Sequence, residues 1–490
     1  MSATSTSATT TPPSTRLNRD SRIVALIVAS AFFMNMLDGA IITTSLPQMA
    51  ASFGVVPLEM SVGVTIYMLT VAAFVPLAGW LADRFGARNI FMLAILVFTL
   101  ASLACGLAQE LWQFVVARAV QGLGGALMTP VGRMVVLRNA QKSELLHATA
   151  LISWPALFAP VIGPMLGGFI TTYASWQWNF YINIPIGAVG LYLTARYIPK
   201  QGDESPRRLD LVGFVLSASG LMCLLYGMES FAYSHGSPAI SAALVAGGLL
   251  LGIFAVRHLH RAPVPLLDLR SFKVRTFSLC TLWAGSYFRT AINATPFLLP
   301  LFYQIGFGLN ALQAGLYVLA YFAGNLGMKT VTTPTLKRYG FRTVLAINGV
   351  LAGLSIAACA FFTPQTSQVL MLVVLFIAGL TRSMQFTALN TLAFADIHAS
   401  QRSSASTLSS MLQQVSMVLG VAVAALLLAL SQHLHGNPSL QLADFRIAFI
   451  AFGALAFVSS LMFLTLPEDA GVEVSGHQPV RDGASASQRT

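Results

Sequence analysis

The sequence is poor in charged residues: only 9% of its 490 residues are Asp, Glu, Lys or Arg, whereas 56% are hydrophobic. Soluble domains carry a charge at about 25% of positions, so this composition excludes a soluble globular protein. The apolar stretches are continuous and do not alternate with a period of two, which excludes an outer-membrane β-barrel. The sequence therefore predicts an all-α polytopic membrane protein.

The sequence also lacks the motifs of enzymes, nucleotide-driven pumps and metal proteins. It contains no GxxxxGK(S/T), HExxH or GxSxG pattern, and no soluble stretch large enough for a nucleotide-binding domain. Its cysteines fall singly in apolar stretches without CxxC spacing, at Cys105, Cys223, Cys280 and Cys359. We therefore expect no catalysis, no cofactor and no metal, which leaves an ion gradient or facilitated diffusion as the driving force.

Fourteen apolar stretches are long enough to cross a bilayer, since about 20 helical residues span a ~30 Å hydrocarbon core. We place these spans near residues 23–46, 60–82, 88–108, 111–136, 146–171, 177–197, 210–229, 238–257, 276–304, 311–333, 342–363, 368–391, 404–431 and 444–466. Basic residues gather on alternate connections, and the other connections hold only Arg446. The positive-inside rule then places both termini in the cytoplasm.

This topology also explains the net charge of +11 without a nucleic-acid partner, because the bases are scattered over short connections. The two ends of the chain, residues 1–22 and 468–490, are polar and are expected to be disordered cytoplasmic tails.

A short motif occurs twice at equivalent positions. Residues 79–88 (GWLADRFGAR) follow the second span and residues 333–342 (TPTLKRYGFR) follow the tenth, with one glycine and two arginines aligned. Repeated halves around a central site are typical of transporters. We therefore divide the chain into a first six-helix half (23–200), an inserted helix pair (201–260) and a second six-helix half (261–467).

Asp38 is the one acid that lies clearly inside an apolar span. A carboxylate inside a membrane costs several kcal/mol, so it needs a partner, and such acids mark functional sites. Arg118, inside the fourth span, stays protonated and must find acceptors. We expect Asp38 and Arg118 to share one polar network that couples proton occupancy to helix movement. A purely structural role for each residue is the alternative.

Several ordered stretches resemble one transporter family. Residues 79–88 resemble the loop 2–3 signature of the major facilitator superfamily. Other stretches are similar to motifs of its fourteen-span drug:proton antiporters, the EmrB/QacA type: residues 37–47 (LDGAIITTSLP), 118–126 (RAVQGLGGA), 163–168 (GPMLGG) and 176–187 (WQWNFYINIPIG). The chain departs from this pattern at Ala159, where Gly is frequent, and at Gln177, where Arg is frequent. Asp83 also has no acidic counterpart in the second half.

The resemblance covers most of residues 23–467 and implies a function. A relative of these antiporters would export lipophilic or cationic drugs and toxic compounds across the bacterial inner membrane by alternating access, in exchange for protons at Asp38. It would allow a periplasmic adaptor and an outer-membrane channel as partners. The motif residues implied are Gly79, Asp83, Arg84, Gly86 and Arg88 as a lock at the cytoplasmic face; Gln121, Gly122 and Gly125 beside Arg118; and Gly163, Pro164, Gly167 and Gly168 as a packing hinge.

Further polar residues lie inside the spans, mostly in the second half, and are candidates for a substrate pathway: Asn35, Arg289, Asn293, Lys329, Arg382 and Gln385. Bases near span ends can instead extend to the membrane interface, so a structural role stays open for them. Two other functions also stay open. Fourteen spans weigh against a symporter or uniporter for a specific metabolite, and the absence of an output domain weighs against a non-transporting membrane sensor.

Overall fold

The computed structural model describes residues 18–139, 145–200, 209–230, 237–263, 265–267, 269–398, 401–437 and 439–475, and every regular element in these ranges is helical. The first part of the chain forms α1 (Arg19–Phe53), α2 (Ser61–Phe74), α3 (Leu77–Phe85), α4 (Ala87–Leu107), α5 (Leu111–Asn139), α6 (Leu145–Tyr173), α7 (Trp178–Tyr181) and α8 (Asn183–Tyr197). The middle part forms α9 (Leu211–Ser230) and α10 (Pro238–Arg261).

The last part contains six longer helices, joined by short helical segments. Its elements are η1 (Leu269–Lys273), α11 (Arg275–Thr281), α12 (Ala284–Leu301), η2 (Phe302–Gly306), α13 (Ala311–Gly327), η3 (Met328–Thr330), α14 (Thr332–Ala358), η4 (Cys359–Phe361), α15 (Gln368–Ala393), α16 (Arg402–His435), α17 (Leu442–Met462), η6 (Phe463–Thr465) and α18 (Val472–Ser475). Most of the two predicted tails lies outside the described residues, although α1 already begins at Arg19 and α18 falls within the range assigned to the second tail.

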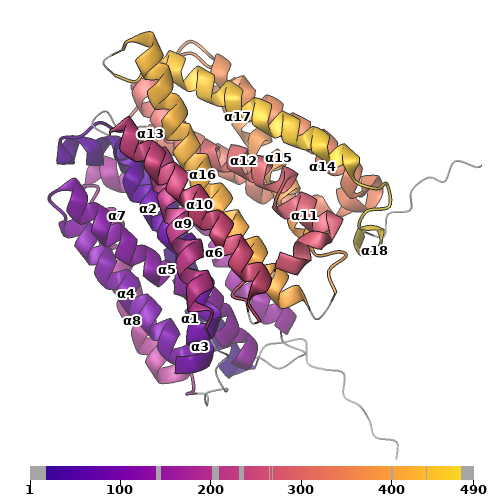
Figure 1. The fold of residues 1–490 in the computed structure, drawn as a ribbon. Coiled ribbons are helices and arrows are strands. Elements are labelled where there is room, and N and C mark those ends of the chain that lie inside the picture. Colours follow the sequence, from indigo (N-terminus) through magenta and orange to yellow (C-terminus); the bar gives the residue numbers. More distant parts are fainter. Residues whose placement is uncertain are drawn as a thin grey trace, which may run out of the picture.

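The long helices form two bundles. In the first bundle α1 packs along α6 and α4 packs along α5; in the second, α13 packs along α15 and α14 along α17. Figure 1 shows the two bundles close together at the end that holds α7 and the start of α13. They diverge toward the opposite end, where α3 closes the first bundle and α18 the second.

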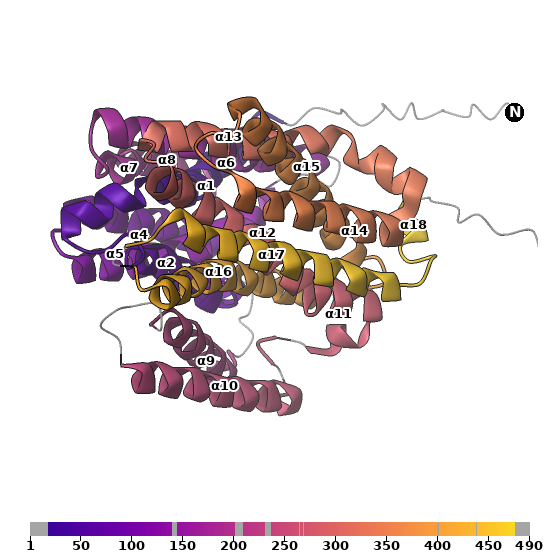
Figure 2. The same cartoon turned by 90° about the horizontal axis from the view of Figure 1, so that it is seen from above.

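Helices α9 and α10 lie beside the two bundles rather than within either. Figure 2 shows them as a pair at the edge of the molecule. They pack mainly against each other, and α9 also contacts α2 and α16. Helix α10 exposes Leu249, Leu250 and Ile253, which is the surface expected of a helix with lipid on most of its sides.

Several helices show the composition of membrane spans. Among the described residues, nine helices are long and apolar enough to cross a membrane, or ten if the bent pair α2 and α3 forms one span. That pair bends by 59° near Pro76, because proline removes a backbone donor and breaks the helical ladder. The prediction of a multi-pass helical membrane protein is confirmed, while the count of fourteen spans stays a prediction.

The sequence repeat has a structural counterpart. Gly86 ends α3 with φ 84°, and Gly340 breaks α14 with φ 73° at the aligned position. Only glycine adopts positive φ at little cost, so each half turns at its own glycine. The arginines that follow also occupy similar places: Arg88 donates to the Ala195 carbonyl near the end of α8 (2.6 Å), and Arg342 pairs with Glu468 after the last long helix (2.6 Å).

Glycines bring the backbones of α13 and α15 into close contact. A Cβ atom added at Gly379 would lie 1.8 Å from the Tyr321 carbonyl oxygen, and one added at Gly324 would lie 2.0 Å from the Phe376 carbonyl oxygen. Small residues at helix crossings are a common means of packing in membranes, where no hydrophobic effect drives helices together.

We predict that Gly379→Ala destabilises the protein, because α13 and α15 must separate to accept the methyl group. Overpacking of this kind costs about 1–3 kcal/mol. Thermal unfolding of the purified protein should show a clearly lower midpoint. Gly252→Ala is the matched control, since an added Cβ meets no atom within 4 Å there, and a midpoint for Gly379→Ala equal to that of the control would contradict the packing argument.

Candidate functional site

Asp38 lies in the middle of α1, inside the first bundle, and both of its carboxylate oxygens accept hydrogen bonds. Oδ2 accepts from Arg118 Nη1 at 2.6 Å, and Oδ1 accepts from Gln121 Nε2 at 2.8 Å and from Asn183 Nδ2 at 3.0 Å. The Asp38 and Arg118 side chains are each only 1% exposed. Charge-assisted hydrogen bonds of this length are the strong ones, and with them both oxygens of the carboxylate are occupied.

Arg118 projects from α5 and is fully buried. Besides Asp38, its Nη1 donates to Gln121 Oε1 at 2.6 Å, and its Nε donates to the carbonyl of Gly63 in α2 at 3.1 Å. The ring of Tyr67 lies 4.2 Å from the guanidinium carbon, close enough for a cation–π interaction. A single guanidinium therefore bonds to groups on α1, α2 and α5.

The site also contains two polar residues that the sequence analysis did not single out, Ser102 and Asn183. Ser102 of α4 accepts from Gln121 Nε2 (3.3 Å) and from Asn183 Nδ2 (2.9 Å), and donates to the Phe180 carbonyl (3.0 Å). Asn183 begins α8 and falls within the family-like stretch 176–187, which was the available signal for it. Ser102 sits in an ordinary apolar span, and nothing in the sequence distinguishes it.

A second polar cluster adjoins the pair. Tyr67 donates to Asn35 Oδ1, and Asn35 Nδ2 donates to Thr129 Oγ1 at 3.2 Å. Gly125 makes room for the Tyr67 hydroxyl, since a Cβ built at Gly125 would lie 2.7 Å from it. A Cβ built at Gly122 would likewise lie 2.7 Å from the Tyr67 carbonyl oxygen. The glycines beside Arg118 therefore allow α5 to approach the helices that hold the polar groups.

The loop motif lies at the end where the bundles diverge. Asp83 of α3 pairs with Arg138 near the end of α5 at 2.9 Å, and the Arg84 guanidinium lies 5.5 Å from the centroid of the Trp80 ring. Gly79 has no atom within 4 Å of an added Cβ, so close helix packing is not its role here. Together with Arg88, described above, these contacts tie α3 to α5 and α4 to α8 within the first half.

The glycine-rich end of α6 contacts both halves. An added Cβ at Gly163 would meet Ala40 at 2.6 Å, and one at Gly167 would meet the Ile41 carbonyl oxygen at 2.7 Å, both on α1. At the seam where α6 meets α13 of the second half, a Cβ built at Gly168 would lie 2.4 Å from the Ala311 carbonyl oxygen. The Pro164 carbonyl oxygen likewise lies 2.3 Å from a Cβ built at Gly315 of α13. Ala159, the departure from the family pattern, is fully buried.

Side chains also join the two halves at this end. Gln48 Nε2 donates to Gln304 Oε1 at 2.9 Å, and Gln304 Nε2 donates to the Thr44 carbonyl at 2.9 Å. Gln304 lies in the π-helical turn η2. The end of α1 and the end of the α12–η2 segment are therefore hydrogen-bonded to each other beside the packed seam of α6 and α13.

The second-half candidates do not form one site. Arg289 is buried and donates to the Cys280 carbonyl (2.9 Å) and to Asn390 Oδ1 (3.0 Å), so it ties α11 and α15 to α12. Gln385 is also buried, and its amide bonds go to α14: Nε2 donates to the Leu345 carbonyl (2.9 Å), and Oε1 accepts from Asn348 (2.9 Å).

The remaining second-half candidates form a smaller group between α12, α13 and α15. Arg382 Nη2 makes a long hydrogen bond of 3.4 Å to Asn293 Oδ1, and Lys329 Nζ donates to Thr387 Oγ1 at 3.0 Å. Arg382 is only partly buried and Lys329 is exposed.

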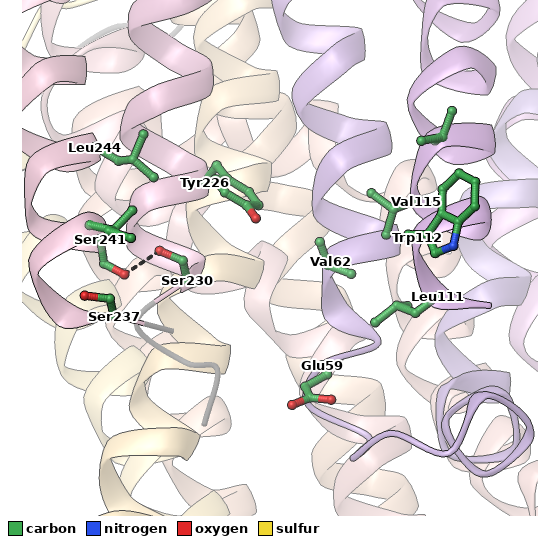
Figure 3. Close-up of a pocket in the computed structure, with 12 residues that line it drawn as sticks. Glu59, Val62, Leu111, Trp112, Val115, Tyr226, Ser230, Ser237, Ser241 and Leu244 are labelled. Carbon is green, nitrogen blue, oxygen red and sulfur yellow. Dashed lines mark hydrogen bonds between the residues drawn. The ribbon is translucent and has the colours of Figure 1, made fainter. Parts of the chain in front are cut away.

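A hollow of about 750 Å³ lies elsewhere, between the first bundle and the pair α9–α10. Figure 3 shows Glu59 and Trp112 on one side of it and Tyr226 on the other. Ser230 and Ser241 share a hydrogen bond of 2.6 Å in its wall. None of the predicted site residues is among those that line it, so this hollow is separate from the site around Asp38.

Comparisons with known proteins agree with this architecture. Residues 28–421 match the model of the Major Facilitator Superfamily. The chain is 37% identical over 454 residues to the putative multidrug resistance protein MdtD of Escherichia coli (strain CFT073), which covers 92% of this chain and 95% of the relative, and equally similar to MdtD of Shigella flexneri.

Solved structures show the same fold. A D-xylose–proton symporter superposes with a TM-score of 0.64 at 13% identity, covering 92% of this chain and 99% of its own. The nucleoside transporter NupG (D323A mutant) gives 0.63 at 14% identity, covering 90% and 99%. At such identity these likenesses show the fold alone. The family match, which spans more than half of the chain, goes further: this protein belongs to the major facilitator superfamily, and it is a multi-pass membrane transporter rather than an enzyme.

Proposed function

We propose that the protein exports small lipophilic compounds across the bacterial inner membrane in exchange for protons. The observation that carries this proposal is the buried Asp38–Arg118 pair, in which the carboxylate is shielded from solvent and both of its oxygens are occupied. Export is supported by the relatives, which are named as multidrug resistance proteins. The cationic substrate class that the resemblance implied belongs to this proposal as one candidate.

Protonation of Asp38 would remove the counter-charge of Arg118. The guanidinium would keep the Gly63 carbonyl, the Gln121 oxygen and the Tyr67 ring, but its charge would be buried without an anion. Breaking a buried ion pair by removing one partner costs about 3–5 kcal/mol. A shift of about 5.5 kcal/mol inverts a two-state population from 1:99 to 99:1, so one proton on Asp38 supplies most of the energy needed to favour another arrangement of α1 and α5.

The arrangement of the bundles supports alternating access. The halves are joined where Gly168 meets Ala311 and where Gln48 meets Gln304, and they spread at the end that holds the loop motif (Figure 1). In this proposal that end lies in the cytoplasm together with both termini, as the positive-inside rule predicts from the sequence. In this proposal the structure is the inward-facing state, the seam of α6 and α13 is the closed outer gate, and Asp83 and Arg138 hold helix ends of the first half in this state.

Other parts of the sequence-based prediction stay with this proposal. These are the division into 6 + 2 + 6 spans, the role of Gly163, Pro164, Gly167 and Gly168 as a hinge, and a periplasmic adaptor with an outer-membrane channel as partners. The position of Gly167 and Gly168 between α1 and α13 supports the hinge, because helix α6 can slide only where small residues face both neighbours.

We expect Asp38→Asn to abolish substrate-driven proton release, because an amide cannot ionise. Inside-out vesicles with an acidic lumen would be supplied with ethidium, tetraphenylphosphonium and deoxycholate in turn while lumenal pH is followed. Wild type should lose protons with at least one compound, and Asp38→Asn with none. Asp20→Asn is the matched control, an exposed acid on the same helix, and it should behave as wild type. Proton release by Asp38→Asn at the wild-type rate would contradict the assignment.

We also expect Gly168→Leu to open the outer seam, because its side chain cannot fit against the Ala311 carbonyl and Leu312. Spin labels at Val56 and Leu434, exposed positions at the joined end of the two halves, would report the separation by pulsed electron resonance. Gly168→Leu should populate a longer distance than wild type.

Gly247→Leu is the control for this measurement, since an added Cβ meets nothing within 4 Å at that position. A distance distribution for Gly168→Leu that matches both wild type and this control would show that the seam is not the gate.

A further inference from the structure

The two halves differ in the charge that they carry inside the membrane. In the first half the buried charges Asp38 and Arg118 cancel at 2.6 Å. In the second half Arg289, Lys329 and Arg382 lie within the α12, η3 and α15 segments, and neither these segments nor α13 contain an Asp or Glu. Intramembrane cations normally pair or mark the path of a charged substrate, and these three bases have no acid on their own segments or on α13.

Arg382 has hydrogen-bond donors to spare. A guanidinium offers five N–H donors, yet Nη2 of Arg382 makes a long contact of 3.4 Å with Asn293 Oδ1, and its buried Nη1 has no hydrogen-bond partner. Its other neighbours are the rings of Tyr321 and Phe322, at 5.6 and 5.4 Å from the guanidinium carbon. The Tyr321 side chain also interacts with the guanidinium, but Nη1 keeps no partner, and a planar fork held between these rings suits a carboxylate, sulfonate or phosphate.

Lys329 adds a second cation beside Arg382. It lies in the short segment η3, where the span that begins with α13 is interrupted, and it reaches across to Thr387 of α15. Thr387 follows Arg382 by five residues on α15, so the contact with Thr387 brings Lys329 to the same part of that helix, where the two positive charges repel each other. An anion bound between them would remove that repulsion. Arg289 is different, because both of its terminal nitrogens are already used by the protein.

The position of this group fits a substrate pathway. Lys329 lies on η3 and Arg382 on α15, and both elements contact α13, which packs on α6 of the first half. Helix α15 also contacts α12, which in turn contacts α1. A cationic compound would find no comparable partner there. Asp38 has both oxygens occupied, and among the described acids of the second half Asp396 binds Thr276 while Asp444 binds Ser431 near a helix end.

We propose that Arg382 and Lys329 form the site for an acidic group on the exported compound, so that the substrates are lipophilic anions or zwitterions that carry a carboxylate, sulfonate or phosphate. This inference rests on the proposed export function, and it revises the charge of the substrate that the family resemblance implied. Lys329 and Arg382 act as binding residues here, and Asp38 keeps the proton.

The test compares three ligands that share one ring system and differ in charge. Binding of 1-naphthylacetate, 1-naphthylacetamide and 1-naphthylmethylammonium to the full-length protein in lipid nanodiscs would be measured by equilibrium dialysis, with empty nanodiscs to subtract partitioning into lipid. No proton gradient is present, so a failure of proton coupling does not affect this result. Wild type should bind the carboxylate at least about tenfold more tightly than the amide or the ammonium.

Four variants locate the site. Arg382→Gln and Lys329→Gln should each remove most of the preference for the carboxylate, whereas Arg382→Lys should keep part of it by keeping the charge. Arg446→Gln, an exposed arginine of the second half, should behave as wild type. Thermal unfolding confirms that each variant is folded. Equal or tighter binding of the ammonium, absence of carboxylate binding to wild type, or an unchanged preference in folded Arg382→Gln would overturn the proposal.

Discussion

The structure depends on one constraint: a carboxylate and a guanidinium that sit inside hydrocarbon must satisfy each other. Asp38 and Arg118 do so at 2.6 Å, Gln121 and Asn183 donate to the other carboxylate oxygen, and Ser102 accepts from both of these amides. Because these groups come from α1, α4, α5 and α8, the pair holds the first bundle together. A change in its charge state therefore acts on four helices at once.

The two halves share a backbone plan but use charge differently. Each turns at a positive-φ glycine after its second span, and each ties the following arginine to the end of its last span. The first half encloses a neutral pair, whereas the second leaves Arg382 and Lys329 without a carboxylate. In our account this asymmetry divides the work, so that the first half binds the proton and the second half binds the substrate.

Sequence reasoning recovered the family and the central pair because charges inside apolar spans are rare and conspicuous. It could not find Ser102, since a single hydroxyl in an apolar helix is common and only the fold brings it to Gln121. It also could not foresee that the amide of Gln385, a pathway candidate, bonds to α14. The number of spans is also hard to predict where proline bends a helix, as at Pro76 between α2 and α3.

The most direct test of this account is infrared difference spectroscopy of the purified protein on acidification, with Asp38→Asn used to assign the carboxyl band. The account predicts that the C=O band of protonated Asp38 rises together with changes in the amide I region, because loss of the Arg118 counter-charge rearranges α1 and α5. A carboxyl band that rises while amide I stays constant would show that protonation and helix movement are not coupled, and would contradict the account.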